Sequence, residues 1–351
     1  MEKLKYFKSL DAYRAFAALA VVLGHYFSEA RGLTNPVLIK LFNLGHSGVS
    51  FFFVLSGFVI TRILLNSTSD KHYFKNFYIR RTLRIFPLYY FALFCFLIFT
   101  SYYLKFSFFE TLYSFKYHLT YMQNIARTFN WDMLGPQHYW SLAVEEHFYL
   151  IWPAVVYFTL KRNLNTLVWT SLVFILVTHV LRFFMVLNEF EINVFTFTRL
   201  DQLVFGGFIA ILESKGYLGK FVKFKLLAII LLAVLGVGIL EIFSNTIIKE
   251  TFKHTFWGLL FGGVIIWTLN NGNSKFVKRV LENLIFQFLG KISYGIYVWH
   301  LLVMNLMDRI YPSKLIPGFF IVFFGTIIFA FTSYKLIEEP FLKLKSKFEF
   351  K

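Results

Sequence analysis

The sequence contains few charged residues and only one cysteine, and each shortage excludes some classes of protein. Charged residues make up 16% of the 351 positions, whereas 57% are hydrophobic, a balance that does not suit a soluble domain. The single cysteine, Cys95, lies in an apolar run and excludes an intramolecular disulfide and a thiolate metal cluster. We therefore expect an all-α protein folded in a bilayer, with no metal site.

The sequence also lacks internal repeats, low-complexity linkers and a stretch typical of a separate soluble domain. We expect one transmembrane domain over residues 1–351, with its core at about 8–342. The last residues, 343–351, are rich in lysine and are expected to form a short basic cytoplasmic tail.

Ten apolar runs are long enough to cross about 30 Å of hydrocarbon as helices. They lie at 9–29, 45–65, 84–104, 141–160, 164–184, 197–213, 226–243, 254–270, 292–309 and 316–337. The first run contains Arg14 and His25 and is nearly a full span long, so we interpret it as an uncleaved helix and not a signal peptide. The sequence thus predicts a polytopic helix bundle with both termini on one side. The longest outer connection, 105–140, is expected to form a re-entrant or surface platform.

Basic residues outnumber acidic ones by 36 to 19, which gives a net charge of +17. They lie in short runs between apolar stretches and not on one polar face, which favours membrane topology over nucleic-acid binding. On the side of the termini there are 23 Lys and Arg residues, on the other side 11, and two lie within spans. The positive-inside rule therefore predicts cytoplasmic termini, in a multi-pass inner-membrane protein.

Two ionisable residues of the first predicted helix are functional candidates, because charge within hydrocarbon is costly. Arg14 and His25 are eleven residues apart, close to a whole number of turns, so they share one face with Asp11. The orientation places Arg14 in the cytoplasmic half and His25 in the outer third. A long anionic donor such as coenzyme A fits this stripe, with its thioester near His25. The structural alternatives are an arginine that snorkels inward and a histidine bonded within the bundle.

Two acidic residues, Glu145 and Glu146, open the fourth predicted span, and we expect them at the depth of His25. A carboxylate can orient an imidazole that takes a proton from a hydroxyl, so one glutamate is predicted to be the partner of His25. The other should face away, because neighbours on a helix point about 100° apart. The alternative is a charged cluster that suits the dipole of a helix start.

Polar groups near the predicted cytoplasmic side suit the donor. Three arginines precede or open the third span: Arg80, Arg81 and Arg84. Such a group binds phosphates, although anionic lipid and the positive-inside rule are alternatives. Ser56 and Ser293 are further candidates for donor binding, and Gly57 allows either a ligand or another helix to come close. Glu338 lies at a similar depth and is expected to pair with the arginines.

Other polar residues are candidates for binding an acceptor on the outer side: Trp140, Glu146, Arg199, Asp201 and His300. Arg199 and Asp201 open the sixth span, where a structural ion pair is the alternative to sugar binding. His300 suits either a site or a hydrogen bond within the bundle.

Several of these segments, taken in order, resemble the bacterial membrane acyltransferase-3 family. They are Leu10–Ala17, the spacing from Arg14 to His25, Gly48–Thr61, Arg80–Pro87, Trp140–Tyr149, Thr198–Leu203, Ile292–His300 and Ile337–Phe341. Each segment alone is a weak signal, whereas the ordered set is specific.

The resemblance implies an O-acyltransferase that modifies surface polysaccharide or another extracytoplasmic sugar. It implies acyl-coenzyme A as the cytoplasmic donor, with acetyl-coenzyme A as the first expectation. Arg14 and His25 resemble the family's essential pair, and Glu145 resembles the acidic residue of its Trp-Ser-Leu motif. His25 would act as a general base or as a nucleophile that forms an acyl-imidazole. Membrane lipid and the sugar acceptor are the expected partners.

Two other functions are compatible with buried charge. A transporter or flippase of a lipid-linked sugar also needs buried Arg, Glu and His, but the sequence lacks the expected repeat. Another class of acyltransferase would centre on His300 with an upstream asparagine such as Asn270. The soluble-type motif of His followed five residues later by Asp occurs at none of the nine histidines.

Overall fold

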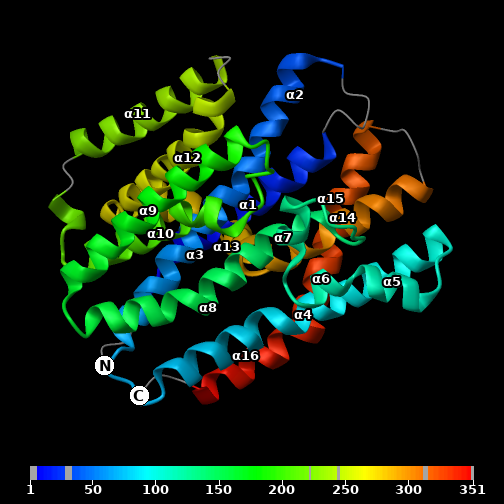
Figure 1. Ribbon diagram of the computed structural model, residues 1–351, viewed down its shortest axis with the longest axis horizontal. Coiled ribbons are helices and arrows are strands. Elements are labelled where there is room, and N and C mark those ends of the chain that lie inside the picture. The colour runs from blue at the N-terminus through cyan, green and yellow to red at the C-terminus, as the bar shows by residue number, and fades with distance from the viewer. Residues whose placement is uncertain (1–5, 28–33, 221–222, 243–245, 311–314, 349–351) are drawn as a thin grey trace.

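The computed structural model describes residues 6–27, 34–220, 223–242, 246–310 and 315–348, and every regular element in these ranges is a helix. Within them, ten helices have eighteen or more residues: α1 Ser9–Tyr26, α3 Ser47–Asn66, α4 Tyr73–Leu104, α8 Trp140–Leu160, α9 Leu164–Leu187, α10 Thr196–Ser214, α11 Lys223–Ile242, α12 Thr246–Asn270, α14 Ser293–Ile310 and α15 Leu315–Ser333. Figure 1 shows one bundle, with α1 and α3 near its centre and α11 at its margin.

Shorter helical elements connect or extend these helices. They are α2 Pro36–Asn43, η2 Leu44–His46, α5 Phe108–Ser114, α6 Lys116–Leu119, α7 Gln123–Thr128, η3 Gln137–Tyr139, η4 Leu218–Lys220, η5 Val277–Leu281, α13 Leu284–Lys291, η6 Tyr334–Glu338, α16 Glu339–Lys345 and η7 Ser346–Phe348. The elements η5 and η6 are π-helical, and the other η elements are 3-10 turns.

Each of the ten predicted runs corresponds to one long helix, while positions 28–29 and 243 lie outside the described residues. Most bounds agree to within a few residues, but α12 begins eight residues before its predicted run and α4 eleven. Among the described residues, four helical stretches are long and apolar enough to cross a membrane: Pro36–Asn66, Tyr73–Leu104, Leu164–Leu187 and Ile316–Lys345. The all-helical prediction is therefore confirmed, and these stretches support a membrane protein. Ten crossings and their orientation stay predictions.

Helix α4 begins eleven residues before the predicted span. The apolar run starts at position 84, but the helix begins at Tyr73 and continues for 32 residues. Aromatic residues are interspersed with the basic ones in this extension, and Tyr73 and Phe77 are buried. Arg81 is eight residues inside the helix, about 12 Å from its start. The arginines therefore lie farther inside the bundle than the hydrophobic run predicted.

Helices α3 and α10 cross at glycines. A Cβ atom built at Gly57 would lie 1.8 Å from the carbonyl oxygen of Leu203, and one at Gly206 would lie 2.0 Å from that of Val54. Real Cβ atoms essentially never approach other atoms within 3.0 Å, so this crossing requires glycine. Gly57 was predicted to let either a ligand or another helix come close, and in the structure it is helix α10 that comes close. This crossing also fixes Ser56, the preceding residue, relative to α10.

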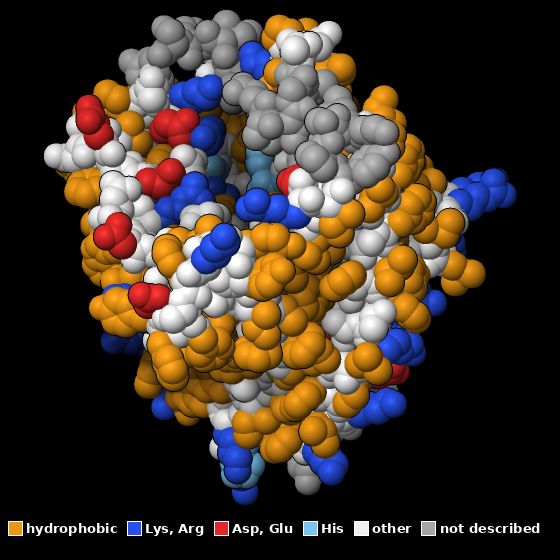
Figure 2. All heavy atoms as spheres, turned by 90° about the vertical axis from the view of Figure 1, so that its right-hand side faces the viewer, with side chains coloured by type: hydrophobic (Ala, Val, Ile, Leu, Met, Phe, Trp, Pro, Cys, Tyr) orange, Lys and Arg blue, Asp and Glu red, His pale blue; other side chains and the backbone are white. Residues whose placement is uncertain are grey.

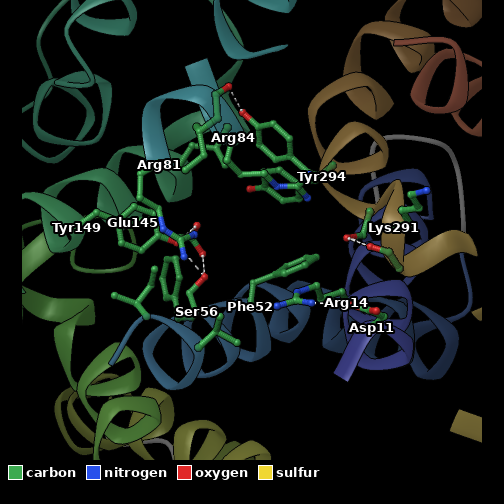
Figure 3. Close-up of a pocket in the computed structure, with 18 of the residues that line it drawn as sticks. Asp11, Arg14, Phe52, Ser56, Arg81, Arg84, Glu145, Tyr149, Lys291 and Tyr294 are labelled. Atoms are coloured by element: carbon green, nitrogen blue, oxygen red, sulfur yellow. Dashed lines mark hydrogen bonds and ion pairs between the residues drawn. The ribbon is translucent and has the colours of Figure 1, made fainter. Parts of the chain in front are cut away.

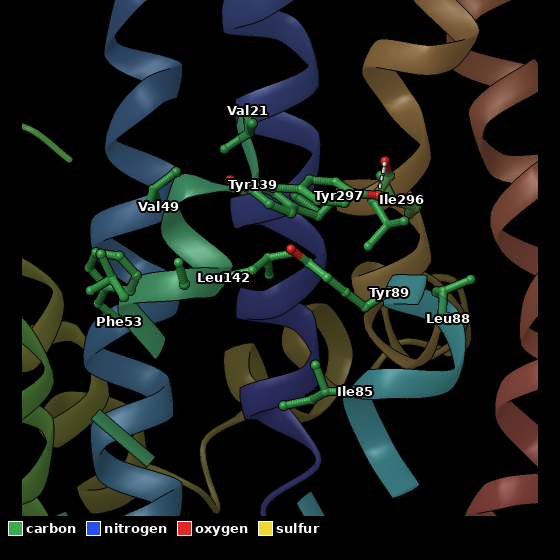
Figure 4. Packing of buried hydrophobic residues seen from close by; sticks show 14 of the residues in the cluster. Val21, Val49, Phe53, Ile85, Leu88, Tyr89, Tyr139, Leu142, Ile296 and Tyr297 are labelled. Atoms are coloured by element: carbon green, nitrogen blue, oxygen red, sulfur yellow. Dashed lines mark hydrogen bonds between the residues drawn. The ribbon is translucent and has the colours of Figure 1, made fainter. Parts of the chain in front are cut away.

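The segment between α4 and α8 packs into the bundle. The Tyr89 hydroxyl donates to the carbonyl of His118 at 2.7 Å, and the Gln123 amide donates to the carbonyl of Tyr139 at 2.8 Å. All four residues are buried. Figure 4 shows Tyr89 and Tyr139 together with Tyr297, among apolar side chains from α1, α3 and α14. Part of this segment is therefore folded into the interior, while other side chains, such as Phe109 at 78% and Tyr113 at 69%, are exposed. Whether it forms a re-entrant or a surface platform stays a prediction.

The described ends of the chain lie close together. The Arg80 guanidinium donates to the carbonyls of Lys345 at 3.4 Å and Phe348 at 3.2 Å. The predicted tail thus begins as the end of α16 and continues as η7 beside α4, while positions 349–351 lie outside the described residues. Tyr6 and Lys345 also line the same cavity. This proximity agrees with an even number of crossings.

Candidate active site

A cavity of about 870 Å³ opens between α1, α3, α4, α8, α13 and α14. Its volume lies within the range of about 300–1,000 Å³ that is usual for ligand pockets. Eight charged residues line it: Arg14, Arg81, Arg84, Lys291, Lys345, Asp11, Glu145 and Glu146. Five are basic and three acidic, so the lining favours an anionic occupant.

Arg14 enters the cavity from α1. Its guanidinium pairs with Asp11 at 2.6 Å and its side chain is 29% exposed. The prediction that Asp11 and Arg14 share a face is therefore confirmed. Helix α13 approaches closely here, because a Cβ atom at Gly290 would lie 2.1 Å from the carbonyl oxygen of Asp11. This contact places Lys291, the next residue, at the cavity wall opposite Glu145 (Figure 3).

Glu145 forms a triangle of hydrogen bonds within the cavity wall. The Ser56 hydroxyl donates to Glu145 Oε1 at 2.9 Å, and the Tyr149 hydroxyl lies 2.9 Å from Oε2 and 3.0 Å from Ser56 Oγ. Arg81 lies over the ring of Tyr149, with its guanidinium carbon 5.4 Å from the centroid. Figure 3 shows Glu145, Ser56 and Tyr149 grouped together, apart from Arg14 and Lys291. The carboxylate therefore orients the Ser56 and Tyr149 hydroxyls in the cavity wall.

Glu146 lines the same cavity, so the prediction that one of the two glutamates faces away is wrong. The cavity extends across more than one face of α8, from α3 to α4, and a rotation of about 100° does not leave it. Glu146 Oε1 is buried and has no hydrogen-bond partner among the described residues. The predicted contact of Glu146 with an outer acceptor is not supported by this position.

His25 lies away from both glutamates, in a group of histidines. Its Nδ1 is 2.9 Å from Nε2 of His300, and its ring centroid is 4.8 Å from that of His46 and 6.5 Å from that of His138. The prediction that Glu145 is the partner of His25 is wrong, because the described hydrogen bonds of Glu145 go to α3 and to its own helix. The prediction failed because it placed Glu145 at the wrong depth in the bundle. Helix α8 starts after a buried turn, η3, and not at the surface.

Tyr297 separates the cavity from the histidines. It lines the cavity, and its hydroxyl donates to the carbonyl of His138 at 2.8 Å and lies 2.5 Å from Ser141 Oγ. Its own carbonyl accepts from His300 Nδ1 at 2.6 Å. Tyr297 is only 4% exposed. One buried residue thus lines the cavity and holds the partner of His25.

The other face of the histidine group is accessible. His25 is half-buried, whereas His46 is exposed. The face on the right of Figure 1, seen in Figure 2, is hollowed, with charged side chains around the hollow and histidine side chains inside it. His46 brings the histidine group to a second surface, while His300 is bonded to Tyr297 at the basic cavity.

Arg199 lies in a buried polar cluster. Its guanidinium donates to Ser50 Oγ at 3.1 Å and to Gln202 Oε1 at 2.9 Å, and it lies 3.2 Å from His254 Nε2. The guanidinium carbon is 5.3 Å from the ring centroid of Trp140. Trp140 and Arg199, both predicted to bind acceptor, are thus brought together.

Asp201 is not the partner of Arg199. Its carboxylate pairs with Arg182 of α9 and accepts from Thr255 of α12 at 3.0 Å. Both members of the ion pair are fully buried. The alternative of a structural ion pair is therefore right for Asp201 but wrong about its partner, and this position does not support acceptor binding by Asp201.

The remaining predicted donor residues divide into two groups. Arg81, Arg84, Ser56 and Ser293 line the cavity. Arg80 is not among the described lining residues, and it holds the carbonyls of the C-terminal segment. Arg84 pairs with Glu338 at 3.4 Å, which confirms the predicted partnership.

Several residues of the site were missed from the sequence: Lys291, Lys345, Tyr149, Tyr297 and His46. The two lysines had been counted only for topology. A signal existed for Tyr297, which is three residues before His300 and therefore on the same side of α14. Asn270, the alternative partner of His300, instead donates to the carbonyl of Leu218 at 2.9 Å.

Comparisons with known proteins identify the family of the chain. A family described as an acyltransferase domain matches residues 7–335. The peptidoglycan O-acetyltransferase OatA of Listeria monocytogenes is 28% identical over 97% of this chain and 56% of its own length. The O-acetyltransferase OatA of Staphylococcus aureus is 26% identical over 97% of this chain and 58% of its own length. The chain thus spans a little over half the length of these relatives. No solved structure matches.

The match over 7–335 extends from the start of α1 to η6 and includes every residue that lines the cavity except Tyr6, Leu342 and Lys345. It favours the acyltransferase interpretation over a transporter or flippase. The chain therefore belongs to the acyltransferase-3 family.

Proposed function

We propose that the chain is a membrane O-acetyltransferase that transfers an acetyl group from cytoplasmic acetyl-coenzyme A to a hydroxyl of an extracytoplasmic glycan. The observation that carries this proposal is the position of the His25–His300 pair, which Tyr297 links to the basic cavity while His46 on its other side is exposed. The names of the relatives support an acetyl group and a cell-wall acceptor.

The basic residues of the cavity suit the phosphates of the donor. Arg14, Arg81, Arg84 and the two lysines converge from four different elements, so an extended anion can contact several of them at once. Hydrogen bonds between a guanidinium and phosphate oxygens are about twice as strong as neutral ones. The apolar part of the wall, with Phe52 and Ile60, suits the less polar arm that carries the thioester.

The acceptor approaches from the other surface. The half-buried indole of Trp140, stacked on the buried guanidinium of Arg199, provides a flat apolar face that suits a sugar ring. His46, exposed next to His25, lies where such a ring would reach the imidazole.

His25 performs the transfer in either of two ways. As a general base it takes the proton of the acceptor hydroxyl while the oxygen attacks the thioester carbonyl, the C–S bond breaks and the proton passes to the departing sulfur. As a nucleophile it forms an acyl-imidazole first, and the acceptor hydroxyl then takes the acyl group. Both routes yield an ester and a free thiol.

The test is to measure ester-linked acetyl groups on surface glycans of cells that express wild type, His25→Ala or His72→Ala protein, by NMR or mass spectrometry. His72 is exposed just before α4 and serves as the matched control. Loss of the imidazole at position 25 should lower acetylation at least about 100-fold, because acid–base catalysis contributes a factor of about 10²–10⁴. Equal acetylation by wild type and His25→Ala would disprove the assignment.

A further inference from the structure

We infer that His300 is a positioning residue that holds the proton of His25 on Nδ1 and so presents Nε2 as the reactive atom. The inference rests on the proposed role of His25. It assigns His300 to neither acceptor binding nor a separate catalytic centre.

The assignment begins at a backbone carbonyl. The carbonyl of Tyr297 can only accept, so the atom that faces it at 2.6 Å, Nδ1 of His300, must carry a proton. A neutral imidazole has one N–H group and one lone pair. Nε2 of His300 therefore has the lone pair and can only accept.

The same reasoning passes to His25. Its Nδ1 lies 2.9 Å from Nε2 of His300, and since that atom only accepts, Nδ1 of His25 must donate. The neutral His25 ring then has its lone pair on Nε2. A base or a nucleophile needs this lone pair, so the chain from carbonyl to His300 to His25 selects the reactive tautomer.

The surroundings of His300 keep this series of hydrogen bonds in one arrangement. His300 is fully buried and His138, whose ring centroid lies 4.6 Å away, is 3% exposed. His138 Nε2 lies 3.3 Å from the carbonyl of Val298 on the same helix, α14. Both rings are therefore tied to backbone carbonyls of one rigid element.

The arrangement also explains how His25 is used during transfer. When Nε2 of His25 takes a proton or an acyl group, the ring becomes a cation and its Nδ1–H bond to His300 becomes charge-assisted. The proton of His300 stays on its Nδ1, which donates to the Tyr297 carbonyl, so the positive charge remains on His25. His25 can then return its proton to the departing sulfur or release its acyl group to the hydroxyl.

The direct test is ¹⁵N NMR of histidine-labelled full-length protein in lipid, because the two ring nitrogens shift differently with and without a proton. The His25 signals are assigned by comparison with His25→Ala. Wild type should carry the proton on Nδ1 of His25, and His300→Leu should move it toward Nε2. A proton on Nε2 of His25 in wild type would overturn the inference, and this readout does not require activity.

Three substitutions at His300 separate positioning from packing. The amide oxygen of Gln lies about where Nε2 of the imidazole lies and can accept from His25, whereas Asn carries the same amide on a shorter side chain that does not reach. His300→Gln should keep kcat within about threefold of wild type, while His300→Asn and His300→Leu should lower kcat at least about tenfold with an unchanged KM for acetyl-coenzyme A.

Equal kcat values for the Gln, Asn and Leu variants would overturn the positioning role. An active His25→Ala protein would instead overturn the proposed function, so the two failures are distinguishable.

Discussion

Replacing Gly57 by alanine should weaken the crossing of α3 and α10. The added Cβ would lie 1.8 Å from the carbonyl oxygen of Leu203 and 2.6 Å from its carbonyl carbon, both backbone atoms. To restore even 3.0 Å to the oxygen, the helices must separate by at least 1.2 Å, the difference between the two distances. Overpacking of this kind costs about 1–3 kcal/mol or more.

Gly238→Ala in α11 is the matched control, because a Cβ atom there meets nothing within 4 Å. The same change should stabilise that helix by about 0.5–1 kcal/mol, since glycine is the poorer helix former. Thermal unfolding in detergent, followed by the fluorescence of the seven tryptophans, measures both variants. Gly57→Ala should unfold several degrees below wild type and Gly238→Ala at or above it. Equal shifts for the two variants would refute the close approach.

Two further perturbations test the donor cavity and the buried ion pair. Arg81→Gln should raise the KM for acetyl-coenzyme A roughly tenfold, because it removes a charged hydrogen-bond donor from the cavity. Lys75→Gln, at an exposed position on the same helix, should leave the KM unchanged. An unchanged KM in steady-state kinetics of Arg81→Gln would place the donor elsewhere. Asp201→Leu should cost about 3–5 kcal/mol in thermal unfolding, because it leaves Arg182 buried without its partner. Loss of the half-exposed pair through Arg127→Met should cost under about 1 kcal/mol, and similar costs for the two variants would contradict a desolvated pair.

Features that depend on local spacing were predictable from the sequence. The apolar runs predicted the long helices, the interval from Asp11 to Arg14 predicted that they share a face, and the depth of Glu338 predicted its pairing with an arginine. Each of these follows from helical periodicity or from the cost of charge in hydrocarbon. Gly57 was predicted in the same way, as a place where a backbone comes close.

Features that depend on depth or on distant pairing were not predictable. The depth of Glu145 depends on the buried turn that precedes α8, and no hydrophobic run reveals that turn. The hydrogen bond between His25 and His300 joins residues 275 positions apart. Likewise, Asp201 pairs with Arg182 across two helices although Arg199 is nearer in the chain. Periodicity identifies which face of a helix is polar, but only the packing of the bundle determines what that face meets.

Residue 297 is part of both the cavity wall and the hydrogen bonds of the histidine group. Its phenol ring forms part of the inner wall, while its peptide oxygen, four bonds or more away, accepts from the imidazole of residue 300. Removing the hydroxyl through Tyr297→Phe changes the cavity wall and leaves the peptide oxygen in place. A rotation or slide of α14, in contrast, displaces both together. The shape of the cavity wall and the hydrogen bond that holds the imidazole of residue 300 are therefore mechanically linked through a single turn of helix.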